Sequence, residues 1–362
     1  MSVLATVNLT LNDYLQRVDK NDNQLPIVEM VDTSGGALAD LPFVEANDGD
    51  AHKTSMRTGI PAGIFRALYQ AIQPEKSTVT QVSDTCGNLE SLSEIDYDLA
   101  RKNGMSATWM LGEQIPFLEG LGQTMRRAFW YGDEKTNIAG FTGLNVRFNS
   151  KTAANGRNII DAGGSGDGAG YMQSAWLLTL GVNTLHGIFP KGSTGGMEVT
   201  PSDGVPVWSE TFNDETGVAG KMRVLRSHYK WMMGVCLRDW RYQARVCNIS
   251  VKPGPSVSAS VFDGSTTNTN YATNLNNLLN AMIRAKTRVK RSGIMGTQKW
   301  YVSQQVYEAL TFAILNKLTN NLTWSTVAGE QLLTFMGIPV EVDDALSGLD
   351  ADGVTSLEPV VS

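Results

Sequence analysis

The sequence predicts an α+β protein, and three observations support this fold class. A long stretch with helical apolar spacing runs from Ser106 to Tyr131. A block of strand-like runs extends from Ala175 to about Val261. Helix-like and strand-like runs then alternate as far as Leu346. A block of strands followed by a short alternating region indicates the α+β class rather than a fully alternating α/β sheet.

The composition describes an ordinary globular protein that is slightly poor in charge. The chain has 362 residues, 42% of them hydrophobic and 18% charged, which suffices for one large or two ordinary domains with a hydrophobic core. A net charge of -6 argues against a dedicated nucleic-acid binder, which usually carries a basic balance. Three widely spaced cysteines without a CxxC pair indicate reduced thiols in a cytoplasmic setting. We see no signal peptide and no apolar stretch near the roughly 20 residues that span a bilayer.

Residues 39–95 form a polar segment with two strand-like runs, Leu41–Glu45 and Ser77–Val82. Between these runs lies Ala46–Ser55, which is rich in turn-forming residues. An isolated pair of polar strands is marginal in water because it buries little apolar surface. We therefore expect this segment to extend from the molecule and to be stabilised by a neighbour.

The stretch from Ser106 to Tyr131 predicts one long helix of roughly 39 Å at 1.5 Å per residue. Pro116 should bend or divide it. Its apolar residues recur at steps of three or four with one gap, and charged residues take the other face. The apolar residues are Trp109, Leu118, Leu121, Met125 and Phe129.

Further elements are predicted along the rest of the chain. The sequence favours strands at Phe141–Phe148, Trp176–Leu180, Gly196–Val199, Arg223–Cys236, Tyr242–Val251, Trp300–Ser303 and Phe335–Val342. It favours helices at Tyr271–Val289 and Gln304–Leu315, a turn at Asp343–Leu346 and a flexible loop at 163–170.

No pattern in the sequence is typical of catalysis or of cofactor or metal binding. The glycines of 163–170 lack the Gly-Lys-Ser/Thr ending of a phosphate-binding loop. His52, His186 and His228 are widely spread, without the spacing of metal ligands. The pair Asp343-Asp344 follows a strand and is interpreted as a solvated turn. We predict no catalytic residue, no cofactor and no metal.

One segment combines arginines with aromatic residues: Arg238, Asp239, Trp240, Arg241, Tyr242 and Arg245. Arginine stacks on aromatic rings and forks onto carboxylates, so this combination suits interlocking surfaces. A platform for single-stranded nucleic acid is an alternative. Because apolar residues crowd the preceding stretch, paired strands with arginines meeting carboxylates are favoured. Whether those carboxylates belong to the same subunit or to the next one remains open.

This segment, together with Gly181–Ser193, resembles the major capsid proteins of tailed bacteriophages with the HK97-like fold. The second patch contains His186, interpreted as a structural hydrogen-bonding residue, and Lys191. Two weaker patches, Phe129–Asp133 leading to Phe141–Leu144 and Gly337–Leu346, stand in the expected order.

The resemblance implies a division of the chain into five parts. These are an N-terminal arm (1–38, with a short helix at Leu11–Val18), an extended loop (39–95), a spine helix with peripheral domain (96–160), an axial domain with returning peripheral strands (161–346) and a C-terminal tail (347–362).

The resemblance further implies hexamers and pentamers of this subunit, closed into an icosahedral shell around double-stranded DNA that is held without sequence-specific contacts. Because the capsid-like part begins almost at Met1, we expect a separate scaffolding protein. The resemblance also implies a portal and a decoration protein as partners, and no contact with a membrane. The location is the virion, assembled in the host cytoplasm. Two alternatives stay open: the shell of a bacterial nanocompartment with the same fold, and a soluble enzyme with an unrecognised site.

Overall fold

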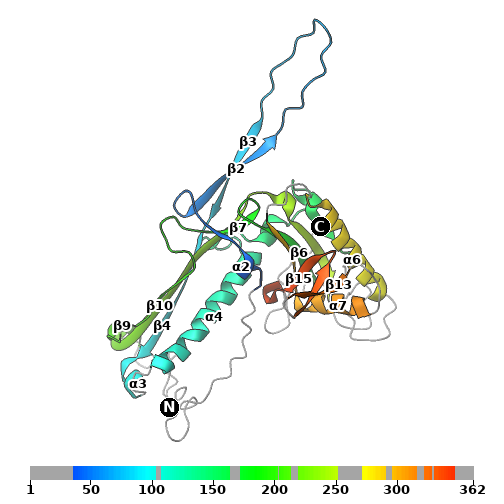
Figure 1. Cartoon of the computed structure of the whole chain (residues 1–362). Coiled ribbons are helices and arrows are strands. Elements are labelled where there is room, and N and C mark those ends of the chain that lie inside the picture. The colour runs from blue at the N-terminus through cyan, green and yellow to red at the C-terminus, as the bar shows by residue number, and fades with distance from the viewer. Residues whose placement is uncertain are drawn as a thin grey trace. The chain divides into compact units, whose positions relative to one another are not determined.

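The computed structural model describes residues 36–102, 107–163, 172–202, 204–212, 219–251, 271–290, 296–315, 322–327 and 330–346. It shows an α+β fold, as predicted. The described residues form two compact units, each built from separate stretches of chain. Unit 1 takes residues 88–125 and 196–232, and unit 2 takes residues 36–87, 126–195 and 233–346 (Figure 1). The division into arm, extended loop, peripheral and axial domains stays a prediction.

Three segments with predicted roles lie largely outside the described residues. They are the arm (1–38), of which residues 36–38 are described, the glycine-rich loop (163–170) and the C-terminal tail (347–362). Within the part of the chain that the structure describes, no helix is both long and apolar enough to cross a bilayer.

Unit 2 is built around a mixed sheet in the order β13-β14-β15-β12-β6-β7-β10. The strands of this sheet that lie in unit 2 are β1 (Phe43–Glu45), β5 (Ile159–Asp161), β6 (Met172–Leu180), β7 (Leu185–Phe189), β11 (Ala244–Ser250), β12 (Thr297–Val302), β13 (Leu322–Val327), β14 (Glu330–Phe335), β15 (Ile338–Val342) and the end of β10 (Ala219–Leu237). Two further strands of unit 2, β2 (Ala51–Gly59) and β3 (Thr78–Thr85), form a separate two-stranded sheet. Every residue of β6 is buried, as expected of a strand covered on both faces.

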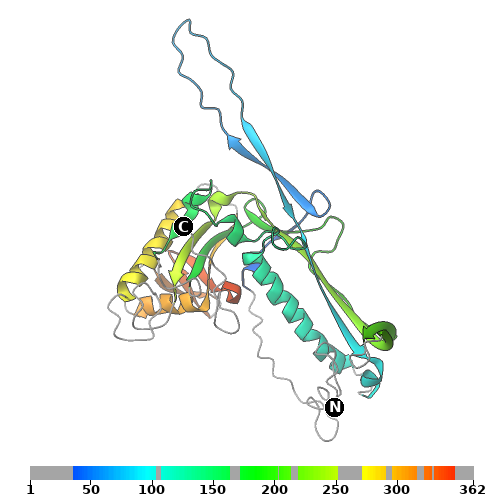
Figure 2. The same ribbon diagram turned by 180° about the vertical axis from the view of Figure 1, so that it is seen from behind.

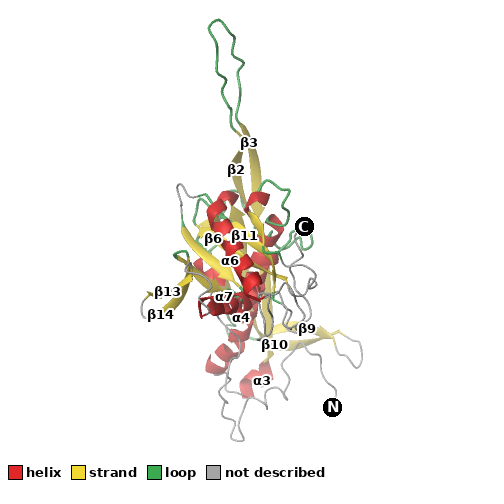
Figure 3. Ribbon diagram, turned by 90° about the vertical axis from the view of Figure 1, so that its right-hand side faces the viewer, coloured by secondary structure: helices red, strands yellow, loops and turns green. Residues whose placement is uncertain are grey.

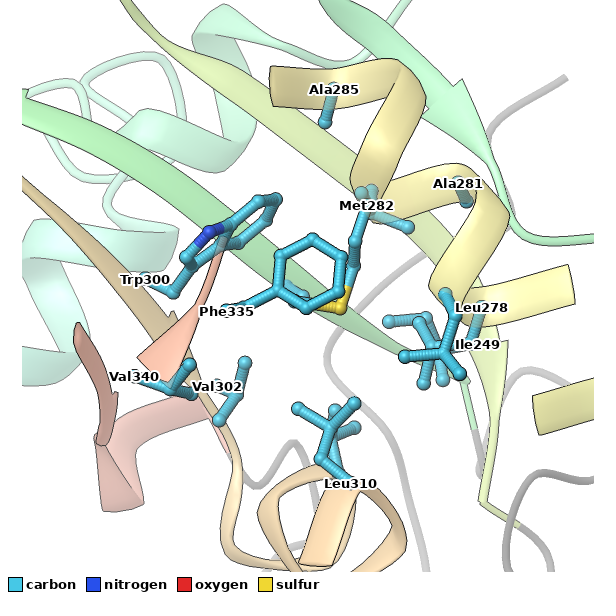
Figure 4. Close-up of a cluster of buried hydrophobic side chains, with 14 of the residues drawn as sticks. Ile249, Leu278, Ala281, Met282, Ala285, Trp300, Val302, Leu310, Phe335 and Val340 are labelled. Atoms are coloured by element: carbon cyan, nitrogen blue, oxygen red, sulfur yellow. The ribbon is translucent and has the colours of Figure 1, made fainter. Parts of the chain in front are cut away.

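Helices pack on the sheet of unit 2 and enclose its hydrophobic core. Helix α6 (Tyr271–Arg288) contacts β11, and α7 (Gln304–Leu315) contacts β15 (Figures 2 and 3). The apolar residues of α6 recur at helical spacing, so one face is buried against the strands. Figure 4 shows this core, with Met282 from α6, Leu310 from α7 and Trp300 from β12 turned toward one another.

Short elements complete unit 2. They are α2 (Gly36–Asp40), α5 (Leu144–Arg147) and the 3-10 turns η1 (Gly156–Asn158), η3 (Trp240–Tyr242) and η4 (Asp344–Leu346). Helix α2 contacts the residue that follows β15, because the backbone N–H of Ala37 donates a hydrogen bond to Asp343 Oδ2 at 2.9 Å.

Unit 1 contains β4 (Gly87–Asp96), α3 (Tyr97–Lys102), β8 (Met197–Thr200), β9 (Val207–Phe212), most of β10 and the first part of α4 (Ala107–Tyr131). The strands β8 and β9 each pair antiparallel with β10. Phe117 of α4 stacks on Tyr229 of β10, with ring centroids 5.6 Å apart. Glu94 of β4 accepts hydrogen bonds from the Arg226 guanidinium and from Ser209, which joins three strands.

The long helix is confirmed, with bounds one residue from those predicted. Pro116 does not divide it, since α4 is continuous from Ala107 to Tyr131. The predicted apolar stripe is buried where side chains are described, at Leu121, Met125 and Phe129.

Three predicted elements are wrong. The segment Phe141–Phe148 contains helix α5 instead of a strand, because its buried apolar residues Phe141, Leu144 and Phe148 follow helical steps of three and four. The predicted single strand Phe335–Val342 is two antiparallel strands, β14 and β15, reversed by a turn at Met336-Gly337 where both residues have positive φ.

The third error concerns the polar segment after β1. The predicted turn-rich stretch becomes strand β2 from Ala51 onward, and β2 is the partner of β3. Strand β1 instead pairs parallel with β7.

The expected turn at Asp343–Leu346 is present as η4, and Asp344 is exposed, but the expected solvation of Asp343 is wrong. This side chain is 1% exposed and accepts backbone hydrogen bonds from Ala37 and Ala345. Burial raises the pKa of the Asp343 carboxyl, and those hydrogen bonds only partly offset it.

Candidate assembly site

The most exposed part of unit 2 is a hairpin formed by β2, β3 and the connecting residues 60–77, here named the hairpin arm (Figure 1). Its strands pair antiparallel from Ala51↔Thr85 to Gly59↔Thr78, with an irregularity near the tip. Residues 57–59 are exposed or half-buried, and 61–80 are all exposed. The arm therefore contributes almost nothing to the core of its own subunit.

The tip of the hairpin arm is apolar, which is unusual for a fully exposed segment. Its large hydrophobic side chains are Ile60, Ile64, Phe65, Leu68, Tyr69 and Ile72. Phe65 and Tyr69 are fully exposed, and Leu68 is 87% exposed. Such a concentration of exposed apolar side chains on a protein surface typically marks a site of protein–protein contact. The sequence analysis identified the arm as polar and missed this patch, although the run from Ile60 to Ile72 is visible in the sequence.

The root of the hairpin arm is held firmly on the sheet. Asp84 of β3 forms a buried ion pair with Arg147 of α5 (Nη1–Oδ1 2.7 Å). Arg147 also donates to the backbone carbonyl oxygen of Val235 in β10 at 3.0 Å. Gly234 allows the arm to approach β10, since a Cβ at this position would overlap the carbonyl oxygen of Thr85. A rigid root and an exposed tip make the arm suited to present its apolar patch to another molecule.

The loop after β7 holds the segment that leads into the hairpin arm. Lys191 is exposed, and its backbone N–H donates to the carbonyl oxygen of Gly49 at 3.0 Å. The N–H of Gly192 donates to Glu45 Oε1 at 2.8 Å. The predicted site residue Lys191 thus lies beside the root of the arm, with its side chain toward solvent.

The residues predicted for interlocking surfaces lie at the turn between β10 and β11. Asp239 caps the 3-10 turn η3 by accepting from the Arg241 N–H, and it forms a two-pronged ion pair with the Arg241 guanidinium (2.8 and 2.6 Å). Partial burial opposes ionisation of Asp239, but the hydrogen bonds from Arg241 outweigh it and lower its pKa. Arg238 is exposed and donates to Asn183 Oδ1 at 3.2 Å. Trp240 is half-buried.

Two predicted site residues of this segment are buried. Arg245 has no exposed surface: it donates to Ser174 Oγ at 3.0 Å and to the Phe148 carbonyl oxygen at 2.8 Å, with its guanidinium 5.2 Å from the Trp176 ring centroid. Tyr242 is 6% exposed and lies under the Lys290 ammonium. The hydroxyl, the backbone carbonyl oxygen and the ring that Arg245 contacts here all belong to its own chain.

His186 is completely buried in β7, but the structure contradicts its predicted role as a hydrogen-bonding residue. Neither ring nitrogen has a hydrogen-bond partner among the described residues. The structure instead brings His186 together with His52 and Cys236, which lie far apart in the sequence.

The fold and the exposed arm define a class of protein: a phage capsid subunit with the HK97-like fold. A chain of the structure of bacteriophage Epsilon15 matches over 100% of both chains, with 23% identity and a TM-score of 0.73, which establishes the likeness of fold. The capsid of bacteriophage JBD30 matches at 10% identity and a TM-score of 0.42, over 87% of this chain and 92% of that one. No curated protein matches the chain.

The family model described as major capsid protein GP7 matches residues 19–352, and the chain belongs to this family. It is a structural subunit of a phage head and assembles with copies of itself in the virion. This family favours a phage head over the nanocompartment shell that the sequence analysis left open as an alternative.

Proposed function

We propose that copies of this chain form hexamers and pentamers that close an icosahedral head around double-stranded DNA, with each hairpin arm lying on a neighbouring copy. A separate scaffolding protein directs assembly in the host cytoplasm, a portal occupies one vertex, and a decoration protein can bind outside. The chain itself acts without catalysis, and the DNA is enclosed without sequence-specific contacts.

The observation that carries this proposal is the apolar tip of the hairpin arm. Six large hydrophobic side chains are exposed there, among them Phe65, Leu68 and Tyr69. Burying each would contribute about 1.5–3 kcal/mol, so a docked tip gains about 9–18 kcal/mol before ordering and association costs. Those costs are of order 4–15 kcal/mol, so one docked tip alone gives only modest affinity. Closed symmetry, in which every copy both gives and receives an arm, multiplies such modest contacts.

The charge of the chain is consistent with enclosing DNA rather than gripping it. The net charge is -6, and binding of phosphates in a groove would require clustered Lys and Arg. A shell wall of this charge contains the polymer with little affinity for its backbone.

The test is a shortened arm, in which residues 60–77 are replaced by Asn-Gly to join β2 and β3 through a tight turn. Because 61–77 are fully exposed, the variant should fold with an unchanged unfolding midpoint. Electron microscopy of lysates containing all head proteins should then show no closed shells. Normal shells from a folded variant would refute the role of the arm. The matched control is Arg66→Ser with Gln73→Ser, two exposed polar residues of the same loop, which should leave assembly intact.

A further inference from the structure

Three potential metal ligands meet at the root of the hairpin arm, each from a different strand. His52 lies in β2, His186 in β7 and Cys236 in β10, and one donor atom from each lies within 4.8 Å of the other two. The strand registers account for part of this meeting. His186 is the direct cross-strand neighbour of Cys236, and His52 is the direct neighbour of Asp84.

The two histidines lack the hydrogen bonds that buried imidazoles normally make. His186 has no exposed surface, and neither its Nδ1 nor its Nε2 has a partner among the described residues. His52 Nδ1 is likewise buried and unpartnered. Each buried polar atom without a partner costs about 1–3 kcal/mol, so packing alone does not account for this arrangement. The rings stand edge to face with centroids 5.5 Å apart, which satisfies none of the three nitrogens.

The protonation state of His186 suits metal binding. Burial, supported by the neighbouring His52 and Arg238, lowers the pKa of His186 to about 4, so the ring is neutral near pH 7 and its lone pair is available. Burial also lowers the pKa of His52, so the second ring favours the neutral form.

The charged groups around the cluster come from three elements. Asp84 lies on β3, and its Oδ2 has no hydrogen-bond partner among the described residues, while Oδ1 is held by Arg147. Arg238 is the nearby cation on the chain after β10, but it is exposed and bonded to Asn183. The Asp84 carboxylate therefore supplies negative charge beside the ligands, in the position of an outer-shell residue.

We propose that His52, His186 and Cys236 form a binding site for a borderline-soft divalent transition-metal ion of the Zn²⁺ class, with water in the fourth position. Two imidazoles and a thiolate are donors that Zn²⁺ prefers. Donors of a tetrahedral zinc site are about 3.3–3.8 Å apart, as follows from bond lengths of about 2.0–2.3 Å. The observed limit of 4.8 Å requires only that the three side chains close in slightly on the ion.

Binding of the ion must displace a proton from Cys236. Burial raises the pKa of this thiol to about 12, with a further contribution from Asp84, so the free protein holds it as S–H. On binding, the S–H bond breaks, the sulfur–metal bond forms and one proton leaves to solvent.

The consequence would be a metal clip between the hairpin arm and the sheet. The site joins β2 to β7 and β10, and so fixes the root from which the arm extends. This inference rests on the geometry of unit 2 alone and stands or falls separately from the proposed role of the arm.

The first experiment uses the purified full-length chain, stripped with a chelator and titrated with Co²⁺ and then Zn²⁺. We expect one equivalent of Co²⁺ to give tetrahedral d–d bands and a thiolate-to-cobalt charge-transfer band, both removed by Zn²⁺. Calorimetry should show release of about one proton per Zn²⁺. Cys236→Ser and His52→Gln should each weaken Zn²⁺ binding by more than about 100-fold, since even outer-shell changes cost about 10–100-fold.

The control variants are Cys247→Ser, a buried cysteine of β11, and His228→Gln, a histidine of β10 in unit 1, which should bind Zn²⁺ as the unaltered chain does. X-ray absorption at the zinc edge of the unaltered chain should show one sulfur at about 2.3 Å and nitrogens at about 2.0 Å, and it requires no variant to fold. Absence of zinc–sulfur scattering, or equal Zn²⁺ affinity in the unaltered chain and Cys236→Ser, would overturn the proposal.

Discussion

Replacing two highly exposed apolar residues of the arm tip should abolish shell assembly without unfolding the subunit. The variant is Phe65→Ser with Leu68→Ser. Phe65 is fully exposed and Leu68 is 87% exposed, so neither contributes to the core of its own chain. The free energy of unfolding of the subunit should therefore change by less than about 0.5 kcal/mol, as is usual for surface substitutions.

The loss in assembly follows from the area that docking would bury. Full burial of these two side chains contributes about 1.5–3 kcal/mol each, or about 3–6 kcal/mol per docked tip. At 1.4 kcal/mol per tenfold, each contact weakens by about 10²–10⁴-fold. Burial of only half of each side chain would still weaken it by about 10-fold to 10²-fold. Because one hexamer would hold six such contacts, shells should disappear at concentrations where the unaltered protein assembles fully.

The assay is sedimentation of lysates that contain all head proteins, followed by electron microscopy and light-scattering mass of the purified subunit. Arg66→Ser with Gln73→Ser serves as the control from the same loop. If the Phe65→Ser, Leu68→Ser protein folds and yields shells in normal amount, the apolar tip is not an assembly surface and the reasoning fails.

Three further predictions concern the subunit itself. Arg147→Met leaves Asp84 charged and buried without its partner, so the free energy of unfolding should fall by about 3–5 kcal/mol in urea denaturation; an unchanged midpoint would exclude a structural role for the pair. Gly234→Ala places a Cβ against the Thr85 carbonyl oxygen and should lower stability by about 1–3 kcal/mol in thermal unfolding, and a neutral effect would show that β10 and β3 can separate. Asp239→Ala removes the cap of η3, which should cost about 0.5–2 kcal/mol at neutral pH. Because the folded pKa of Asp239 lies below its ordinary 3.8, this difference should be constant above about pH 5 and vanish as pH falls through the folded pKa; a difference that persists in acid would contradict it.

The helices could be predicted from the sequence because their apolar spacing survives in the fold. Both α6 and α7 pack one face on a sheet, and α4 buries Leu121, Met125 and Phe129 at steps of four. Such periodicity depends on burial on one side, which holds for these helices. The segment Phe141–Phe148 was wrongly predicted as a strand. A single turn of helix has too few residues to distinguish the helical period of 3.6 residues from the strand period of 2.

The hairpin arm was harder to delineate because its strands pack on no core. Strand β2 reads Ala51-His-Lys-Thr-Ser-Met-Arg-Thr-Gly59, with no alternation of apolar and polar residues. Backbone hydrogen bonds pair β2 with β3, although residues 60–77 separate the two strands in the sequence. Such backbone pairing leaves no pattern of side chains from which it could be predicted. The sequence analysis therefore paired the wrong strands.

The cluster at the root of the arm was beyond sequence reasoning for another reason. More than a hundred residues separate His52 from His186 in the sequence, and about fifty separate His186 from Cys236. No spacing rule connects them, and the strand register joins only His186 and Cys236 directly. The ion-pair and capping roles of Asp239 and Arg241, by contrast, are local and follow from the sequence segment that was singled out.

The most direct measurement is cryo-electron microscopy of the assembled particle at a resolution that shows side chains. The account predicts that residues 60–77 of each subunit lie against a neighbouring copy, with Phe65 and Leu68 buried between the two chains. Arms whose tips project into solvent with Phe65 exposed, in an otherwise closed shell, would contradict it.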